Sequence, residues 1–198
     1  RWEDFIEFID KLEDNREAIG SDIKTIVFDT INQAYEMLTP YTLKSAGKLD
    51  GCIYRTVGDT MGGKTNFWVE RDRLLKIQID RIFRLGFVPF FITHLEVKTI
   101  KPKKAEPYDV YKSTMPDRLE NLIYPLVDFI ITGERRVLTL EDGKSDEKRV
   151  LLTRGSNMAV AGSRVAIDKE IVFDTESEAM EKYQEEFRKS IERNLELA

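Results

Sequence analysis

Apolar positions along the chain follow two patterns, a helical repeat of three to four residues and short continuous runs. The helical repeat predicts amphipathic helices at residues 1 to about 18, Ile31 to about Leu38, Phe67–Leu85, Asp117–Ile123 and the last 23 residues. The continuous runs predict strands buried on both faces, as in parallel sheets, at Lys24–Thr30, Phe87–Thr93 and Leu126–Thr132. Strands separated by helices predict an α/β fold.

The segments between these elements predict loops and one hairpin. Residues 39–65 resemble a loop with a short strand at Cys52–Val57, and Leu95–Pro116 has three prolines and no apolar period. A structureless stretch of this length is typically functional. Two short strands, Arg136–Glu141 and Arg149–Arg154, flank a turn at 142–144. We therefore expect one domain over 1–198, with a mostly parallel sheet, an antiparallel C-terminal hairpin, flanking helices and an amphipathic helix at 176–198.

Composition narrows the classes of function. The 198 residues carry 31 Lys+Arg and 36 Asp+Glu, a net charge of −5, so contact with nucleic acid requires a local basic patch. The single cysteine, Cys52, and the single histidine, His94, exclude a disulfide framework and zinc sites with several cysteine or histidine ligands. No membrane-length apolar run and no signal peptide are present, which predicts a cytoplasmic protein. The chain begins with Arg1, which indicates that an upstream part is missing.

Polar residues follow the first two predicted strands. Asp29 and Thr30 end the first strand, and His94 ends the second. Ligands of open α/β sheets bind at the carboxyl ends of strands, where an acid can hold the magnesium ion of a nucleotide. We therefore expect Asp29 and His94 at one edge of the sheet, with His94 placed to sense a terminal phosphate. The alternatives are an aspartate that caps the next helix and a structural histidine.

The segment Gly58–Thr65 satisfies the phosphate-loop pattern G-x-x-x-x-G-K-[ST] through Gly58, Gly63, Lys64 and Thr65. A phosphate loop requires a strand before it and a helix after it, so that backbone N–H groups surround the phosphates. The preceding strand at Cys52–Val57 is weak, and the pattern follows the Asp29 strand instead of preceding it. The alternative is a flexible segment that faces DNA.

The segment Leu95–Pro116 combines cations with aromatic rings, namely Lys98, Lys101, Lys103, Lys104 and Lys112 with Tyr108 and Tyr111. Lysines follow phosphates, and aromatic rings stack on bases of single strands. This composition predicts a site for single-stranded DNA, and the alternative is a solvated charged loop. Arg154, which ends a predicted strand, is a candidate arginine finger for the nucleotide of a neighbouring subunit, and the alternative is a side chain that the hairpin presents to solvent.

A family resemblance covers residues 22–165. It is carried by four segments, in this order along the chain: "TIVFDT", "GFVPFFITH", "LVDFIITGERR" and "KRVLLTRGSNMAVAGSR". They resemble the RecA-like P-loop ATPases of phages, AAA-type nucleotide-binding proteins that include single-strand-annealing recombinases. The resemblance implies a RecA-like P-loop NTPase core that binds ATP and Mg²⁺, forms homo-oligomers and acts on single-stranded DNA in recombination, in the cytoplasm of a bacterial host. It implies that Asp29 and Thr30 form the magnesium site, with Asp29 acting through water. His94 would be the polar sensor, and Leu95–Pro116 would be the second DNA-binding loop.

The chain departs from this family upstream of the first strand. The family carries a phosphate loop and a catalytic glutamate there, and neither precedes Ile26. We therefore expect an ATPase only if the full-length protein carries the upstream loop. The alternative is a non-catalytic α/β binding or assembly module that binds no nucleotide.

Overall fold

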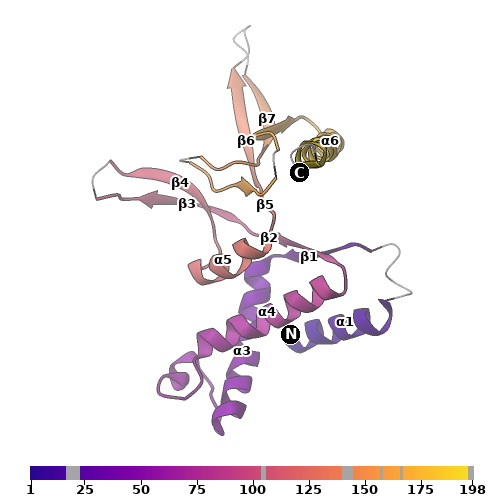
Figure 1. Ribbon diagram of the computed structural model, residues 1–198. Helices are drawn as coiled ribbons and strands as arrows, with labels where there is room; N and C mark the ends of the chain where they lie inside the picture. The colour runs from indigo at the N-terminus through magenta and orange to yellow at the C-terminus, as the bar shows by residue number, and fades with distance from the viewer. Residues whose placement is uncertain (17–22, 104–105, 140–144, 157, 166, 196–198) are drawn as a thin grey trace. The chain divides into compact units, whose positions relative to one another are not determined.

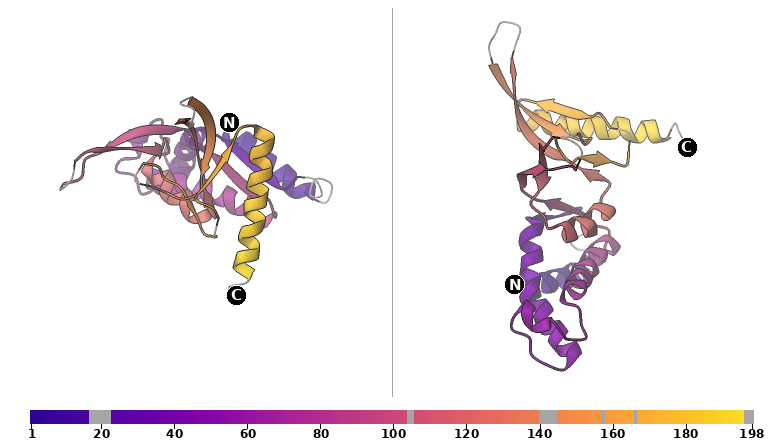
Figure 2. Two further views of the ribbon diagram at one scale, coloured as in Figure 1. Left: turned by 90° about the horizontal axis from the view of Figure 1, so that it is seen from above. Right: turned by 90° about the vertical axis from the view of Figure 1, so that its left-hand side faces the viewer.

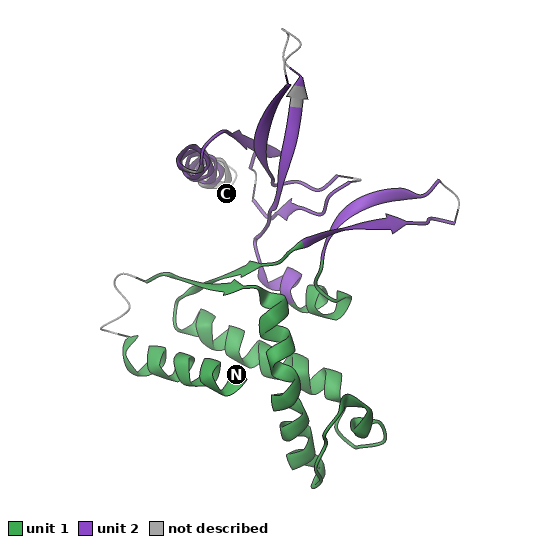
Figure 3. Ribbon diagram, turned by 180° about the vertical axis from the view of Figure 1, so that it is seen from behind, with its two compact units in different colours: residues 1–94, 114–122 green, residues 95–113, 123–198 purple. Residues whose placement is uncertain are grey.

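The computed structural model describes the whole chain except residues 17–22, 104–105, 140–144, 157, 166 and 196–198. The described chain divides into two compact units (Figure 3). Unit 1 contains residues 1–94 and 114–122, and unit 2 contains residues 95–113 and 123–198. None of the described helices is both long enough and apolar enough to cross a membrane.

Unit 1 is built mostly from helices (Figure 1), namely α1 (Trp2–Asp14), α3 (Ile31–Asp50), α4 (Phe67–Arg84) and α5 (Asp117–Ile123). Their apolar stripes are buried, with Ile9, Leu38, Leu75, Ile79 and Leu119 fully inaccessible. Arg81 of α4 reaches two acids of α1, Asp10 at 2.6 Å and Glu13 at 2.7 Å. The helices predicted at the start of the chain, at Phe67–Leu85 and at Asp117–Ile123 are confirmed, with small shifts of their ends.

Helix α3 is longer than the sequence predicts, because it continues through Pro40 to Asp50. A proline inside a helix removes one backbone hydrogen bond and costs about 3 kcal/mol. Beyond Pro40 the helix buries Leu43 and Ala46, and this burial offsets the cost. The helix ends at Gly51, whose φ of 72° is left-handed. The prediction of a loop from residue 39 is therefore wrong as far as residue 50.

The parallel sheet of unit 1 consists of two strands, β1 (Thr25–Asp29) and β2 (Val88–Ile92), in register from Thr25–Val88 to Asp29–Ile92. One face is buried through Phe28, whose ring lies 5.6 Å from that of Phe5 and 5.1 Å from that of Phe91. On the opposite face Val27 and Phe90 are 55% and 52% exposed. The prediction of strands buried on both faces is therefore wrong for this pair, since helices cover one face.

Unit 2 contains a β-ribbon where the sequence predicts a loop. Strands β3 (Leu95–Ile100) and β4 (Tyr108–Ser113) pair antiparallel over their full lengths, with Leu95 opposite Ser113 and Ile100 opposite Tyr108. Both strands contain apolar, β-branched and aromatic residues as well as charged ones on each face, and most of their side chains are exposed. The prolines lie outside both strands, at 102, 107 and 116. They therefore do not interrupt the ladder.

The rest of unit 2 is an antiparallel sheet in the order β6 (Thr132–Thr139), β7 (Ser145–Leu152) and β9 (Glu170–Phe173), with α6 (Glu176–Leu195) packed beside β9 (Figure 2). The predicted hairpin is confirmed with longer strands, and its turn at 142–144 lies outside the described residues. The terminal helix is confirmed as α6. The single-turn 3₁₀ helix Tyr124–Leu126 precedes β5 (Phe129–Ile130), which pairs antiparallel with β8 (Gly162–Ser163).

The predicted third parallel strand, Leu126–Thr132, is wrong. That segment instead forms a 3₁₀ turn, the two-residue strand β5 and the start of β6, all outside the parallel pair. The fold is α/β with several small sheets, and among the described residues parallel pairing is found between β1 and β2 and in one isolated bridge, Tyr111–Ala159. The expected mostly parallel sheet is therefore not found.

Candidate functional site

Asp29 and His94 lie at the same edge of the parallel pair, as predicted. Asp29 is the last residue of β1 and pairs with Ile92, two residues before His94. Both side chains are exposed, and among the described residues neither side chain has a hydrogen-bond partner. Two polar side chains with free bonding capacity therefore stand at the carboxyl edge, where α/β sheets bind ligands.

A cluster of three further side chains, which the sequence did not indicate, lies beside this edge. The hydroxyl of Thr93 donates to the amide oxygen of Asn32 at 2.8 Å. The amide nitrogen of Asn32 donates to the hydroxyl of Thr114 at 3.2 Å. The two threonine hydroxyls are 3.5 Å apart. This Asn32–Thr93–Thr114 cluster joins the start of α3, the end of β2 and the segment before α5.

The backbone closes the same region. The N–H of Thr114 donates to the carbonyl of His94 at 2.9 Å. Leu95 begins β3 directly after His94, and Ser113 ends β4 directly before Thr114. The first strand of the ribbon, β3, therefore begins next to His94, and the second, β4, ends next to Thr114, the residue to which His94 is hydrogen-bonded. The signal that could have indicated the cluster is weak, since Asn and Thr are common wherever strands and helices end.

Thr30 serves as the N-cap of α3. Its hydroxyl accepts a hydrogen bond from the N–H of Gln33 at 3.3 Å, and the peptide bond between Asp29 and Thr30 is cis. N-cap hydroxyls satisfy one of the free N–H groups of the first helical turn. In the structure the Thr30 side chain thus stabilises the start of α3, and its role beside a metal ion stays a prediction.

The edge fits a magnesium ion only if water and phosphate oxygens supply most of its ligands. Among the described residues no group of three or more His, Cys, Asp or Glu side chains is placed to hold a metal ion. Mg²⁺ in nucleotide sites is commonly held by one or two carboxylates, with water and phosphate oxygens completing the octahedron. The unpaired carboxylate of Asp29 fits this arrangement, with Asp29 as the protein's contribution. A site made of protein ligands alone does not fit.

The Gly58–Thr65 segment lacks the surroundings of a phosphate loop. The predicted strand at Cys52–Val57 is not formed, and a 3₁₀ helix, η1 (Val57–Thr60), occupies part of the segment. The carboxylate of Asp50 accepts hydrogen bonds from the hydroxyl of Thr65 at 2.6 Å and from its N–H at 3.1 Å. Asn66 caps α4 by accepting from the N–H groups of Trp68 and Val69. The hydroxyl and N–H of Thr65 and the first N–H groups of α4 are thus bonded within the protein, whereas the Lys64 side chain forms no ion pair with any described residue.

Asp50 is expected to hold this segment in place. Hydrogen bonds from Thr65, and then from Tyr54, keep the pKa of the Asp50 carboxyl below its ordinary value of 3.8. In Asp50→Ala we expect faster tryptic cleavage after Lys64, because the anchor of the segment is gone. A depressed pKa means that the stabilisation is present above the ordinary pKa and is lost as the pH falls through the depressed one. Amide hydrogen exchange of residues 64 and 65 across pH 2–6 measures this, and unchanged exchange in Asp50→Ala would contradict it.

The ribbon separates the predicted DNA-binding residues by face. Lys98 and Tyr108 share one face with Ile100 and Val110, whereas Tyr111 lies on the other face with Leu95 and Val97. Lys101 and Lys103 are exposed near the tip, and Lys104 lies outside the described residues. Lys98, Lys101 and Lys103 form no ion pair with any described residue. The face with Lys98 and Tyr108 also carries the opposed pair Glu96 and Lys112. We call this face, together with the tip residues Lys101 and Lys103, the basic face.

Arg154 follows β7 in unit 2. Its side chain is exposed and forms no ion pair with any described residue, while its N–H donates to the carbonyl of Lys169 at 3.4 Å. A free arginine at the end of a strand is compatible with reaching a neighbouring subunit. That role stays a prediction.

Comparison with known proteins identifies one family. A family model described as "AAA domain" matches residues 1–165, which is more than four fifths of the 198 residues. No curated protein and no solved structure matches the chain.

Proposed function

The chain belongs to the AAA domain family, and we propose that it is the ATP-binding core of a phage recombination protein that acts on single-stranded DNA. The family supports nucleotide binding of the P-loop type. The DNA substrate and the phage setting rest on the ribbon and on the order of sequence segments. The nucleotide lies at the β1–β2 edge, and the DNA lies on the basic face of the ribbon.

The nucleotide side of the proposal rests on Asp29 and His94. Asp29 would hold Mg²⁺ through water, and His94 would contact the terminal phosphate of the nucleotide. The described residues form no phosphate cradle, so we propose that a segment outside residues 1–198 supplies it. Parallel sheets are normally covered on both faces, and the exposed Val27 and Phe90 give such a segment an apolar surface to pack on.

A single observation carries the link between nucleotide and DNA. The residues that flank the ribbon, His94 and Thr114, are bonded to each other, and Thr114 also contacts Asn32 of the cluster. In this proposal a change in the position of His94 is passed on through this bond and the chain to both strands of the ribbon. This gives the bound nucleotide a direct route to the grip on DNA.

The DNA site is tested by neutralising the basic face. In the triple variant Lys98→Gln, Lys101→Gln and Lys103→Gln we expect affinity for a labelled oligothymidine to fall roughly tenfold to a hundredfold at low salt. The slope of log affinity against log salt should flatten by about 2, since each phosphate contact on a single strand contributes about 0.7. Fluorescence anisotropy across a salt series measures both quantities.

A control variant with the same loss of charge separates a local site from net charge. Lys48, Lys76 and Lys169 are exposed and lie outside the ribbon, and their replacement by glutamine should leave the salt slope close to that of the parent. If the ribbon variant binds like the parent, the basic face is not the DNA site. The non-catalytic assembly module then becomes the better proposal, which the absence of a described strand before the Gly58–Thr65 segment also favours.

A further inference from the structure

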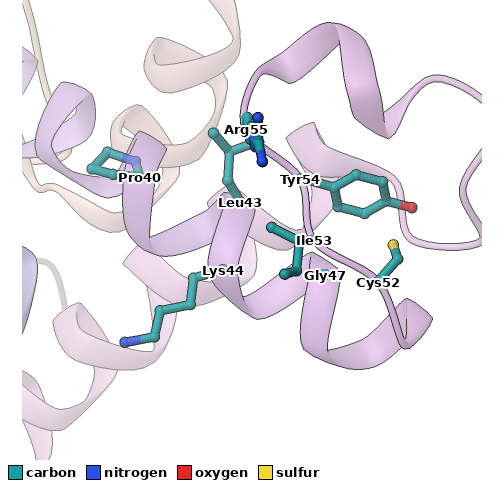
Figure 4. A pocket seen from close by; sticks show the side chains of 8 residues that line it. All are labelled: Pro40, Leu43, Lys44, Gly47, Cys52, Ile53, Tyr54 and Arg55. Atoms are coloured by element: carbon teal, nitrogen blue, oxygen red, sulfur yellow. The ribbon is translucent and has the colours of Figure 1, made fainter.

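A groove far along α3 from the β1–β2 edge has no part in the proposed function. It lies between the second half of α3 and the segment that follows it, and encloses about 290 Å³ (Figure 4). Its lining residues are Pro40, Leu43, Lys44, Gly47, Cys52, Ile53, Tyr54 and Arg55. Since a water molecule occupies about 30 Å³ of liquid, the groove has room for aliphatic side chains of a ligand.

The middle of the groove is apolar and fixed in shape. Leu43 is almost wholly buried, whereas Ile53 is 87% exposed, which is unusual for a large aliphatic residue. A Cβ atom on Gly47 would lie 2.6 Å from the carbonyl oxygen of Cys52, so only glycine allows the segment to approach α3 this closely. The hydrogen bond from the Tyr54 hydroxyl to Asp50 at 2.7 Å holds the segment there.

The sides of the groove are positively charged. Lys44 and Arg55 both belong to the lining (Figure 4), and neither forms an ion pair with any described residue. The two acids of the neighbouring sequence are occupied, because Asp50 binds Tyr54 and Thr65, and Asp59 accepts from the N–H groups of Arg55 and Thr56. The side-chain N–H groups of both cations therefore remain open to an outside partner, and the carboxylate of Asp59 stays charged near Arg55.

We propose that this groove binds an acidic peptide segment of a partner protein, with an aliphatic side chain between Leu43 and Ile53 and flanking carboxylates on Lys44 and Arg55. The two cations favour an anionic partner. The aliphatic middle of the groove favours, among anionic partners, one that also carries an aliphatic side chain. Binding of single-stranded nucleic acid is favoured by aromatic faces that are open for stacking. Among the lining residues the one aromatic ring is that of Tyr54, which is held by its hydroxyl on Asp50, and the middle of the groove is formed by the aliphatic Leu43 and Ile53. A lipid surface favours convex apolar insertion, whereas the site is concave.

The test uses a fluorescein-labelled dodecapeptide of four Glu-Asp-Leu repeats. The parent chain should bind it about tenfold more tightly than a counterpart with Ser for Leu, and than one with Gln and Asn for the acids. The double variant Lys44→Glu, Arg55→Glu should bind the peptide about tenfold more weakly, and so should Ile53→Asp. The control Lys76→Glu, Arg84→Glu changes the net charge equally on α4 and should bind like the parent.

Circular dichroism establishes that each variant is folded, and these surface substitutions leave the buried core intact. The proposal is overturned if the parent does not bind the peptide, or if the Lys44 and Arg55 double variant binds as tightly as the parent. It is also overturned if Lys44 and Arg55 prove to bind oligothymidine or phosphatidylserine vesicles more tightly than the peptide. The lysine variants of the ribbon should leave peptide binding unchanged, so the two proposals can fail separately.

Discussion

Replacement of Phe28 by alanine is expected to destabilise unit 1 by about 3–5 kcal/mol, the usual cost of truncating a buried phenylalanine. Phe28 is 6% exposed and packs between the rings of Phe5 and Phe91, so its loss leaves a cavity between α1 and both parallel strands. Typical domains are stable by about 5–15 kcal/mol, so this is a large share. Urea denaturation followed by tryptophan fluorescence should show a midpoint lower by about 1–3 M.

The neighbouring residue offers a matched control for this change. Val27 precedes Phe28 in β1 but points to the opposite, exposed face. Val27→Ala should shift the midpoint far less, because surface substitutions usually change stability by less than about 0.5 kcal/mol. Equal destabilisation by the two variants would show that both faces of the strand are covered in solution, contrary to the structure.

Loss of the Tyr108 ring is expected to weaken the binding of single-stranded DNA to the ribbon more than loss of the Tyr111 ring does. Stacking of one base on an aromatic ring contributes about 1–3 kcal/mol, which corresponds to roughly five- to a hundredfold in affinity. Tyr108→Ala should therefore weaken binding by this factor and leave the salt slope unchanged, since stacking is not ionic. Anisotropy titrations of oligothymidine at three salt concentrations measure both.

Tyr111 is the control for this prediction. It is exposed to a similar degree, yet it lies on the face opposite Lys98, with Leu95 and Val97 as neighbours. Tyr111→Ala should bind DNA nearly as well as the parent. If Tyr111→Ala is the weaker variant, the DNA follows the other face of the ribbon, and the lysines act only at long range.

The sequence correctly predicted those elements in which the apolar repeat and the capping residues indicate the same helix or strand that packing in the folded protein stabilises. Helix α4 has an uninterrupted apolar period, a capping Asn66 and a terminal Gly86 with a φ of 80°, and its prediction was accurate. The prediction of α3 ended too early, because the burial of its second half outweighs the local penalty of Pro40. Leu126–Thr132 was misread because a short apolar run does not reveal whether its partner strand is parallel or antiparallel.

The candidate site was predictable in part. The sequence placed Asp29 and His94 at one edge, because each follows an apolar strand and parallel strands end on the same side. The Asn32–Thr93–Thr114 cluster was out of reach, since its members are 61 and 21 residues apart and only the folded backbone brings them together. The separation of Tyr108 from Tyr111 was hidden for a similar reason, because it depends on reading Leu95–Pro116 as a ribbon with a two-residue repeat.

The hydrogen bond between His94 and Thr114 fixes the base of the ribbon, whereas the length of the ribbon beyond this bond can vary. Residues added or removed in equal numbers from both strands near the tip leave this bond in place and change only the length of the arm. Two extra residues on each strand would extend its reach by about 7 Å. A single residue inserted within β4 would instead exchange the two faces along part of that strand. Homologous chains should therefore tolerate hairpins of different lengths, but only those that keep the alternation of faces.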